Sequence, residues 1–151
     1  HWGNSRLTYM DPEILVFKSG YEYRQLTNYD WATPEQRAGK AIPVRKSAWN
    51  GKTIALKPYT GTIQAYKGHF ESLNKELERV ATDNPEDCNW KKLPKTIAAI
   101  GRERKALEEK GVNPHTLFSI DKELILNDEH YTKKGKASCG SPKAFLQGIQ
   151  Q

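Results

Sequence analysis

Residues 69–80 read HFESLNKELERV. Large apolar side chains recur in this stretch at every third or fourth position, at Phe70, Leu73, Leu77 and Val80. That spacing lines them along one face of an α-helix, with charged and polar side chains on the other faces. Asn84-Pro85 follows and is expected to end the helix, because the residue before a proline avoids helical backbone angles. The stretch therefore predicts that the helical part of the chain begins near His69.

Two further helices are expected downstream. The segment from Pro94 to Lys110 has helical periodicity and can close at Gly111. Its apolar side is formed by Ile97, Ile100 and Leu107. Ser141-Pro142 can start a last helix, because proline suits the first helical position. The side chains that this helix would bury are Phe145, Leu146 and Ile149. Between these two helices, the segment from Thr116 to Leu126 fits either a strand or a helix.

The N-terminal half is expected to be rich in β-strands. Ile14 to Phe17 is a short apolar run, and Tyr21 to Leu26 alternates aromatic or apolar side chains with polar ones. A half-buried strand requires this period of two, and Gly20 between the runs can turn the chain. Further on, Thr33-Pro34-Glu35-Gln36 has the capping box and early proline of a short helix.

Asn50-Gly51 is the clearest turn signal in the chain. Both inner positions of a type I′ turn need positive φ, which Asn and Gly tolerate. Ile42 to Trp49 precedes this dipeptide and Lys52 to Lys57 follows it, so the pattern predicts a hairpin. Thr62 to Tyr66 could add a third strand to the resulting antiparallel sheet.

The length and composition indicate one folded domain. A chain of 151 residues is near the usual size of a single domain, so we expect one domain over residues 1–151. The predicted class is α+β, with a small antiparallel sheet in the N-terminal half packed against two or three helices from the C-terminal half. The mean hydropathy is low, at −0.81, but fifteen aromatic residues indicate a real core. No apolar run approaches the roughly 18–20 residues that a membrane span requires.

Few residues in the sequence suit a metal or a cofactor. Cys88 and Cys139 lie 51 residues apart and could form one disulfide or remain free thiols. The four histidines are too scattered to complete a zinc site with them, so no metal is expected. Tyr23-Arg24 resembles the first strand motif of bacterial effector domains that use nicotinamide dinucleotides, but the serine–threonine–serine strand and the paired glutamates of that family are absent. We therefore expect no cofactor.

The charge distribution favours an anionic polymer as partner. The formal charge is +6, and no acidic residue occurs between Glu35 and Glu71. Cations interleaved with aromatic rings suit nucleic acid, because phosphates attract the cations and unpaired bases stack on the rings. RNA or single strands fit better than duplex, because their bases are free. The expected binding residues are Arg37, Lys40, Arg45, Lys46, Trp49, Lys52, Lys57, Tyr59, Tyr66 and Lys67.

A second cluster of residues suits phosphodiester cleavage. Residues 128–134 read DEHYTKK, and the segment resembles the aspartate–histidine–tyrosine segment near the end of small microbial ribonucleases over a few residues only. An effector-type, metal-independent nuclease would need two proton-transfer groups and a cation to stabilise the phosphate. His130 could be one such group and Lys133 the cation, with His69, Glu71 or His115 as the second proton carrier.

Two other functions remain open at this point. Cys88 precedes a predicted helix, and with His115 or His130 downstream it could serve a cysteine-dependent hydrolase or acyltransferase. Alternatively, the chain is a non-catalytic protein–protein interaction domain. Acidic and basic blocks alternate after residue 70, and such a pattern could match a partner of opposite charge.

Overall fold

The computed structural model describes residues 13–27, 38 and 49–149. The chain divides into two compact units, His1–Tyr59 and Thr60–Gln151, which we call the strand unit and the helical unit. The expectation of one domain over residues 1–151 stays a prediction. The predicted helix at Thr33-Pro34-Glu35-Gln36 lies outside the described residues, as does the segment 42–48 of the predicted hairpin.

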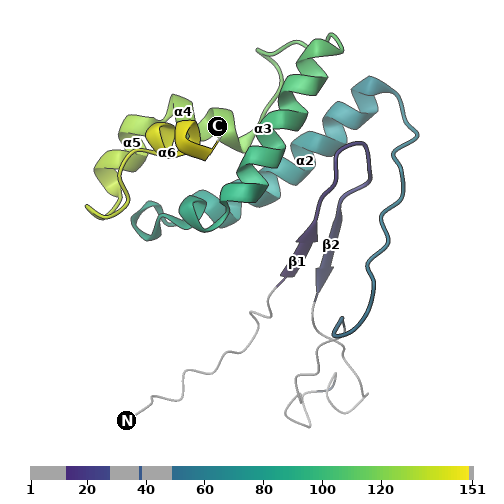
Figure 1. Cartoon of the computed structure of the whole chain (residues 1–151), viewed down its shortest axis with the longest axis horizontal. Helices are drawn as coiled ribbons and strands as arrows, with labels where there is room; N and C mark the ends of the chain where they lie inside the picture. The colour runs from purple at the N-terminus through teal and green to yellow at the C-terminus, as the bar shows by residue number, and fades with distance from the viewer. Residues whose placement is uncertain (1–12, 28–37, 39–48, 150–151) are drawn as a thin grey trace. The chain divides into compact units, whose positions relative to one another are not determined.

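The strand unit is built on an antiparallel pair of short strands (Figure 1). Strand β1 spans Glu13–Val16 and β2 spans Arg24–Thr27, with Ile14 opposite Leu26 and Val16 opposite Arg24. Side chains opposite each other share a face, so the buried Leu26 and the half-buried Ile14 lie on the same side. Gly20, with a φ of 74°, turns the chain between the strands, as expected.

The second turn of the strand unit differs from the expected type. The Lys52 N–H donates to the Trp49 carbonyl at 3.1 Å, which closes a four-residue turn around Asn50 and Gly51. Gly51 has a φ of 71°, but among the described non-glycine residues only Cys88 has a positive φ. The type I′ prediction is therefore wrong, since it needs positive φ at both inner residues. Positive φ at the third residue alone is typical of a type II turn.

Residues 52–57 form no strand. The chain pairs with the β1–β2 hairpin only at the residue that follows them. Pro58 pairs with Tyr21 as an isolated antiparallel bridge. The Glu22 N–H donates to the Lys57 carbonyl at 2.8 Å, and the Tyr59 N–H donates to the Gly20 carbonyl at 2.9 Å. Both hydrogen bonds use the neighbours of Pro58, so its missing N–H leaves no gap in the pairing.

The helical unit opens with α2, Ile63–Thr82, a helix of 20 residues. The predicted third strand at Thr62–Tyr66 is therefore wrong, because this segment is the first turn of α2. Thr62 is the N-cap, and its Oγ1 accepts a hydrogen bond from the Ala65 N–H at 3.2 Å. Tyr66 lies four residues before Phe70 and extends the same apolar stripe. The helical period of this stripe therefore outweighs the short apolar–polar alternation within residues 62–66.

The rest of the helical unit is also helical. The connection after α2 contains two short 3₁₀ helices, η1 (Pro85–Asp87) and η2 (Asn89–Lys92). The α-helices that follow are α3 (Pro94–Glu109), α4 (Ile120–Leu126), α5 (Asp128–Lys134) and α6 (Pro142–Ile149). The helices predicted from Pro94 and from Ser141-Pro142 are confirmed, and the ambiguous segment contains a helix. The described residues thus hold five α-helices where two or three were expected, and the α+β class is confirmed.

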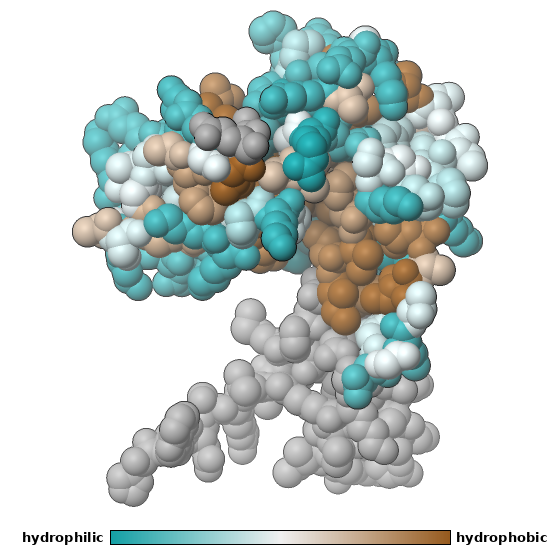
Figure 2. Space-filling view, viewed as in Figure 1, coloured by the Kyte–Doolittle hydropathy of each residue, from teal (hydrophilic) through white to brown (hydrophobic). Residues whose placement is uncertain are grey.

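The core of the helical unit lies where α2 and α3 meet the group of shorter helices α4, α5 and α6 (Figure 1). Its largest fully buried apolar side chains are Phe70, Leu73, Trp90, Ile97, Ile100, Leu107, Leu117, Ile120, Leu124 and Leu146. In the view of Figure 2, hydrophilic residues cover much of the helical unit's visible face. This division follows from the apolar stripes of α2, α3 and α6.

Buried polar groups join α2 and α3 to the start of α4. The Asn74 side chain is fully buried; its Oδ1 accepts from the Ile120 N–H at 2.9 Å and its Nδ2 donates to the Phe70 carbonyl at 2.8 Å. Glu71 accepts from the Phe118 N–H at 3.1 Å. Arg104 of α3 pairs with the buried Asp121 at 3.1 Å. Side chains of the long helices therefore satisfy backbone donors at the N-terminus of α4, which otherwise have no partner.

Replacing Asn74 with Ala should lower the free energy of unfolding by about 1–3 kcal/mol, because the Ile120 N–H is left buried without its acceptor. Urea denaturation followed by circular dichroism measures this change. Asn84→Ala is the matched control, since Asn84 is exposed, and its effect should stay within about 0.5 kcal/mol. Equal effects of the two substitutions would contradict the role assigned to Asn74.

Candidate functional site

Cations lie against aromatic rings in the strand unit. The Lys18 ammonium lies 4.0 Å from the centroid of the Tyr21 ring. The Arg24 guanidinium and the Lys52 ammonium each lie 5.8 Å from the centroid of the Trp49 ring. These distances are within the range of a cation–π attraction. Trp49 and Lys52 were expected from the sequence, whereas Lys18, Tyr21 and Arg24 were missed.

Backbone pairing brings two more of the expected residues to this region. Lys57 and Tyr59 flank Pro58, which pairs with Tyr21. We call the resulting set the basic–aromatic cluster; its members are Lys18, Tyr21, Arg24, Trp49, Lys52, Lys57 and Tyr59. The four cations are exposed and the three rings are half-buried. The exposed Glu22 also lies on this hairpin, so the local charge is positive but not uniformly so.

The strand unit carries most of the net charge of the chain. Residues 1–59 contain nine lysines and arginines and five carboxylates, a net charge of +4 out of the total of +6. The helical unit is larger but carries only +2. Four further expected binding residues, Arg37, Lys40, Arg45 and Lys46, belong to this segment of the sequence but lie outside the described residues.

Two expected binding residues, Tyr66 and Lys67, belong to α2 in the helical unit instead. Tyr66 is buried, and its hydroxyl donates to the buried Glu103 carboxylate at 2.7 Å. Lys67 forms an ion pair with Glu71 at 2.8 Å. A buried ring cannot stack on a base, and a paired ammonium is less available to a phosphate. Both residues therefore serve the helical unit in this structure and are not members of the cluster.

The expected catalytic residues belong to different elements of the helical unit. His130 and Lys133 are exposed on α5, and Lys133 pairs with Glu129 one turn earlier. Their neighbour Tyr131 is buried, and it interacts with Thr82 and Glu78 near the C-terminal end of α2. Burial raises the pKa of Tyr131. His69 and Glu71 belong to the first half of the same helix.

The separation of the two groups follows from helix geometry. Glu71 lies eleven residues before Thr82, and an α-helix rises 1.5 Å per residue, so the two are about 16 Å apart along the axis of α2. The half-buried His69 lies further still from that end, with its ring 6.3 Å from the ring of Tyr66. His69 and Glu71 therefore lie in the half of α2 away from the residues that interact with Tyr131, the neighbour of His130. His115 is exposed in the connection between α3 and α4.

Asp128, which is near His130 in the sequence, has a structural role. Its Oδ1 accepts from the Ser141 hydroxyl at 2.7 Å and from the Lys143 N–H at 2.8 Å. Ser141 also accepts from the Ala144 N–H at 3.1 Å, so both side chains cap the N-terminus of α6. The hydrogen bonds from Ser141 and Lys143 lower the pKa of Asp128 below its ordinary value.

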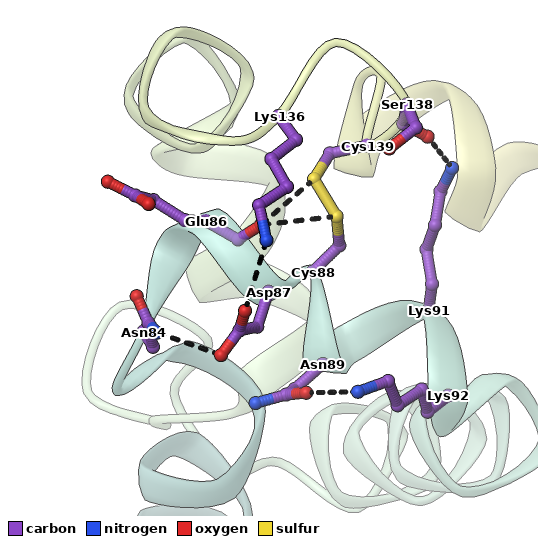
Figure 3. The surroundings of a disulfide bond; sticks show 10 residues. All are labelled: Asn84, Glu86, Asp87, Cys88, Asn89, Lys91, Lys92, Lys136, Ser138 and Cys139. Atoms are coloured by element: carbon purple, nitrogen blue, oxygen red, sulfur yellow. Dashed lines mark hydrogen bonds and ion pairs between the residues drawn. A yellow bond between two sulfur atoms is a disulfide. The ribbon is translucent and has the colours of Figure 1, made fainter. Parts of the chain in front are cut away.

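Cys88 and Cys139 form a disulfide, with their Cα atoms 5.6 Å apart (Figure 3). A bridge over a sequence separation of 51 residues stabilises the folded chain by about 4 kcal/mol in the chain-entropy model. The bonded Cys88 has no thiol to ionise, so a hydrolase that uses it with His115 or His130 would require the reduced form. The tight turn at Cys139 also requires Gly135, since a Cβ there would lie 2.9 Å from the Cys139 Cβ.

The described residues contain no group of three or more His, Cys, Asp or Glu side chains placed to hold a metal ion. Within that same part of the chain, no helix combines the length and the apolar character that crossing a bilayer demands. In comparisons with known proteins, no family model, no curated protein and no solved structure matches this chain.

The lowered pKa of Asp128 predicts a pH-dependent contribution to stability. A carboxylate whose pKa is lower in the folded state stabilises the fold above its unfolded pKa, and this contribution is lost as the pH falls through the folded pKa. We expect Asp128→Asn to destabilise the chain near neutral pH, with the difference from the wild type shrinking as the pH is lowered from neutral to below the ordinary pKa of an aspartate. Thermal unfolding over this range tests it; a difference that is constant with pH would contradict it.

Proposed function

We propose that the strand unit binds single-stranded nucleic acid, RNA or DNA, through the basic–aromatic cluster. The observation that supports this most directly is the pairing of Trp49 with two cations, Arg24 and Lys52, each 5.8 Å from its ring centroid. Cations that lie over an aromatic ring can move to the phosphates of a bound strand, and the ring face then offers a base a stacking surface. Lys18 beside Tyr21 repeats the arrangement.

The two kinds of contact make different contributions. Cations that meet phosphates release condensed counterions, so the affinity falls steeply as salt rises but depends little on sequence. Stacking of a base on an aromatic ring contributes about 1–3 kcal/mol and needs a base that is not paired in a duplex. The net charge of +4 on the strand unit supports the first contribution, and the rings of Tyr21, Trp49 and Tyr59 support the second.

A binding role fits the geometry better than cleavage. Lys133 is paired with Glu129, and His69 and Glu71 lie in the first half of α2, whereas Tyr131 of α5 interacts with the second half. General acid–base cleavage needs both proton carriers within hydrogen-bond reach of one phosphate. The proposal therefore gives His130 no part in the function.

Binding to labelled oligonucleotides at two ionic strengths tests the proposal. We expect the full chain to retard single-stranded RNA or DNA at low salt more strongly than a duplex of the same sequence, with weaker binding at high salt and no cleavage products. Failure to bind any of these at low salt would refute the nucleic-acid proposal and favour a protein partner. If RNA is cut, His130→Ala tests whether a nuclease must be reconsidered.

Two substitutions in the basic–aromatic cluster should separate stacking from charge. Trp49→Ala should weaken single-strand binding by about tenfold or more, and Trp49→Phe should restore part of the loss because it keeps an aromatic face. Lys52→Ala should weaken binding and reduce the slope of log K against log salt by about 0.7, the value for one phosphate contact on a single strand. Fluorescence anisotropy titrations at several salt concentrations measure both effects.

Lys105→Ala is the matched control for Lys52→Ala. Lys105 is an exposed lysine on α3, so its removal changes the net charge equally but leaves the cluster intact. The salt slope of this variant should equal that of the wild type. Equal losses for the two lysine variants would mean that overall charge, and not the cluster, drives binding.

A further inference from the structure

The Cys88–Cys139 disulfide joins two connections of the helical unit. Cys88 lies between η1 and η2 in the connection from α2 to α3, and Cys139 lies in the connection from α5 to α6 (Figure 3). Because neither cysteine is inside an α-helix, the two sulfurs can separate without unwinding one. The bond therefore controls how two connections are held together.

The two sulfurs differ in access. Cys139 is 1% exposed, whereas Cys88 is half-buried. Thiol–disulfide exchange begins when a thiolate attacks one sulfur, and access decides which sulfur is attacked. An incoming thiolate would reach Cys88 Sγ, and Cys139 Sγ would be the leaving group.

Positive charges flank both ends of the bond. The Lys136 ammonium pairs with Asp87, the residue before Cys88, at 3.6 Å. The Lys91 ammonium donates to the carbonyl of Ser138, the residue before Cys139, at 2.8 Å. In Figure 3, Lys136 lies close to the sulfurs, whereas the Lys91 ammonium points to Ser138. An ammonium group near a sulfur stabilises its thiolate, and the pairing of Lys136 with Asp87 offsets part of that effect.

The backbone at Cys88 also favours opening. Cys88 has a φ of 46°, the left-handed region that residues with a Cβ rarely occupy, and no other described non-glycine residue has a positive φ. Once the bond is broken, nothing covalent holds Cys88 in this conformation. Reduction would let the connection between η1 and η2 return to an ordinary backbone geometry.

The helices next to Cys139 depend on tertiary contacts. α5 has seven residues and α6 has eight, whereas isolated helices shorter than about 12–15 residues are marginal in water. Beside the disulfide, α6 is held by Phe145, whose ring lies edge-on to Trp90 with centroids 5.2 Å apart, and by the buried Leu146. The longer helices α2 and α3 bury apolar side chains of their own, among them Phe70, Leu73, Ile97 and Ile100.

From these observations we propose that the Cys88–Cys139 bond is a redox switch that controls the order of α5 and α6. A dithiol supplies the electrons. Its thiolate attacks Cys88 Sγ to form a mixed disulfide, the Cys88–Cys139 bond breaks, and Cys139 Sγ leaves as a thiolate and takes up a proton. The second thiol then displaces Cys88 Sγ, so the chain gains two electrons and two protons while the dithiol becomes a disulfide. Nucleic-acid binding by the strand unit is not needed for this switch.

Hydrogen–deuterium exchange of the full chain, with and without dithiothreitol under native conditions, tests this switch. Mass spectrometry after alkylation reports how much of the bond is reduced. We expect reduction of the folded chain and amide exchange about tenfold faster or more across residues 128–149, with little change in the buried parts of α2 and α3. The Cys88→Ser/Cys139→Ser double variant should show the faster exchange without reductant and no response to it.

Two results would overturn the proposal. The first is a bond that resists dithiothreitol until the chain is unfolded, which would make it a permanent staple. The second is reduction that speeds exchange equally in α2, α3 and residues 128–149, or in none of them. Because the reduced wild-type chain itself gives this answer, failure of the double variant to fold would not obscure it.

Discussion

The backbone N–H of Ile120 is removed from water at the start of α4, and its acceptor is the side-chain oxygen of Asn74 on α2. A buried donor that loses its acceptor costs more free energy than the hydrogen bond contributes, so few side chains can replace this one. The contact fixes where α4 begins along α2, and α4 in turn packs on α3, α5 and α6. The placement of the shorter helices therefore depends in part on one buried amide, together with the contacts of Glu71 and Arg104.

The sequence predicts the fold well where local signals agree. The helix from Pro94 ends at Glu109 with Gly111 in the left-handed region, because proline, apolar spacing and glycine all indicate the same bounds. The start of α2 was misjudged because residues 62–66 are too few to separate a period of two from a helical period. The helix α5 was missed because its seven residues bury only Tyr131 and leave no apolar stripe in the sequence.

The candidate site is only partly predictable, because the sequence gives the order of the charged residues along the chain but not their neighbours in space. The acid-free segment before Glu71 runs from the strand unit into α2, where Tyr66 is buried and Lys67 is paired. Lys18 and Arg24 lie before that segment, among carboxylates in the sequence, yet they contact Tyr21 and Trp49. The alternation from Tyr21 to Leu26 predicts that Arg24 points outward from a strand. It does not show that the partner of Arg24 is Trp49, which lies 25 residues later in the sequence.

The position of the disulfide has a topological consequence. The segment between Cys88 and Cys139 is a covalently closed ring that contains α3, α4 and α5, while α2 and α6 are tails that leave it. A protease that cuts once inside the ring opens it but releases no fragment, since the bridge still joins the two pieces. A cut in either tail releases a fragment at once. A single cut in the connecting segment 110–119 of the oxidised chain therefore leaves both pieces joined by the disulfide.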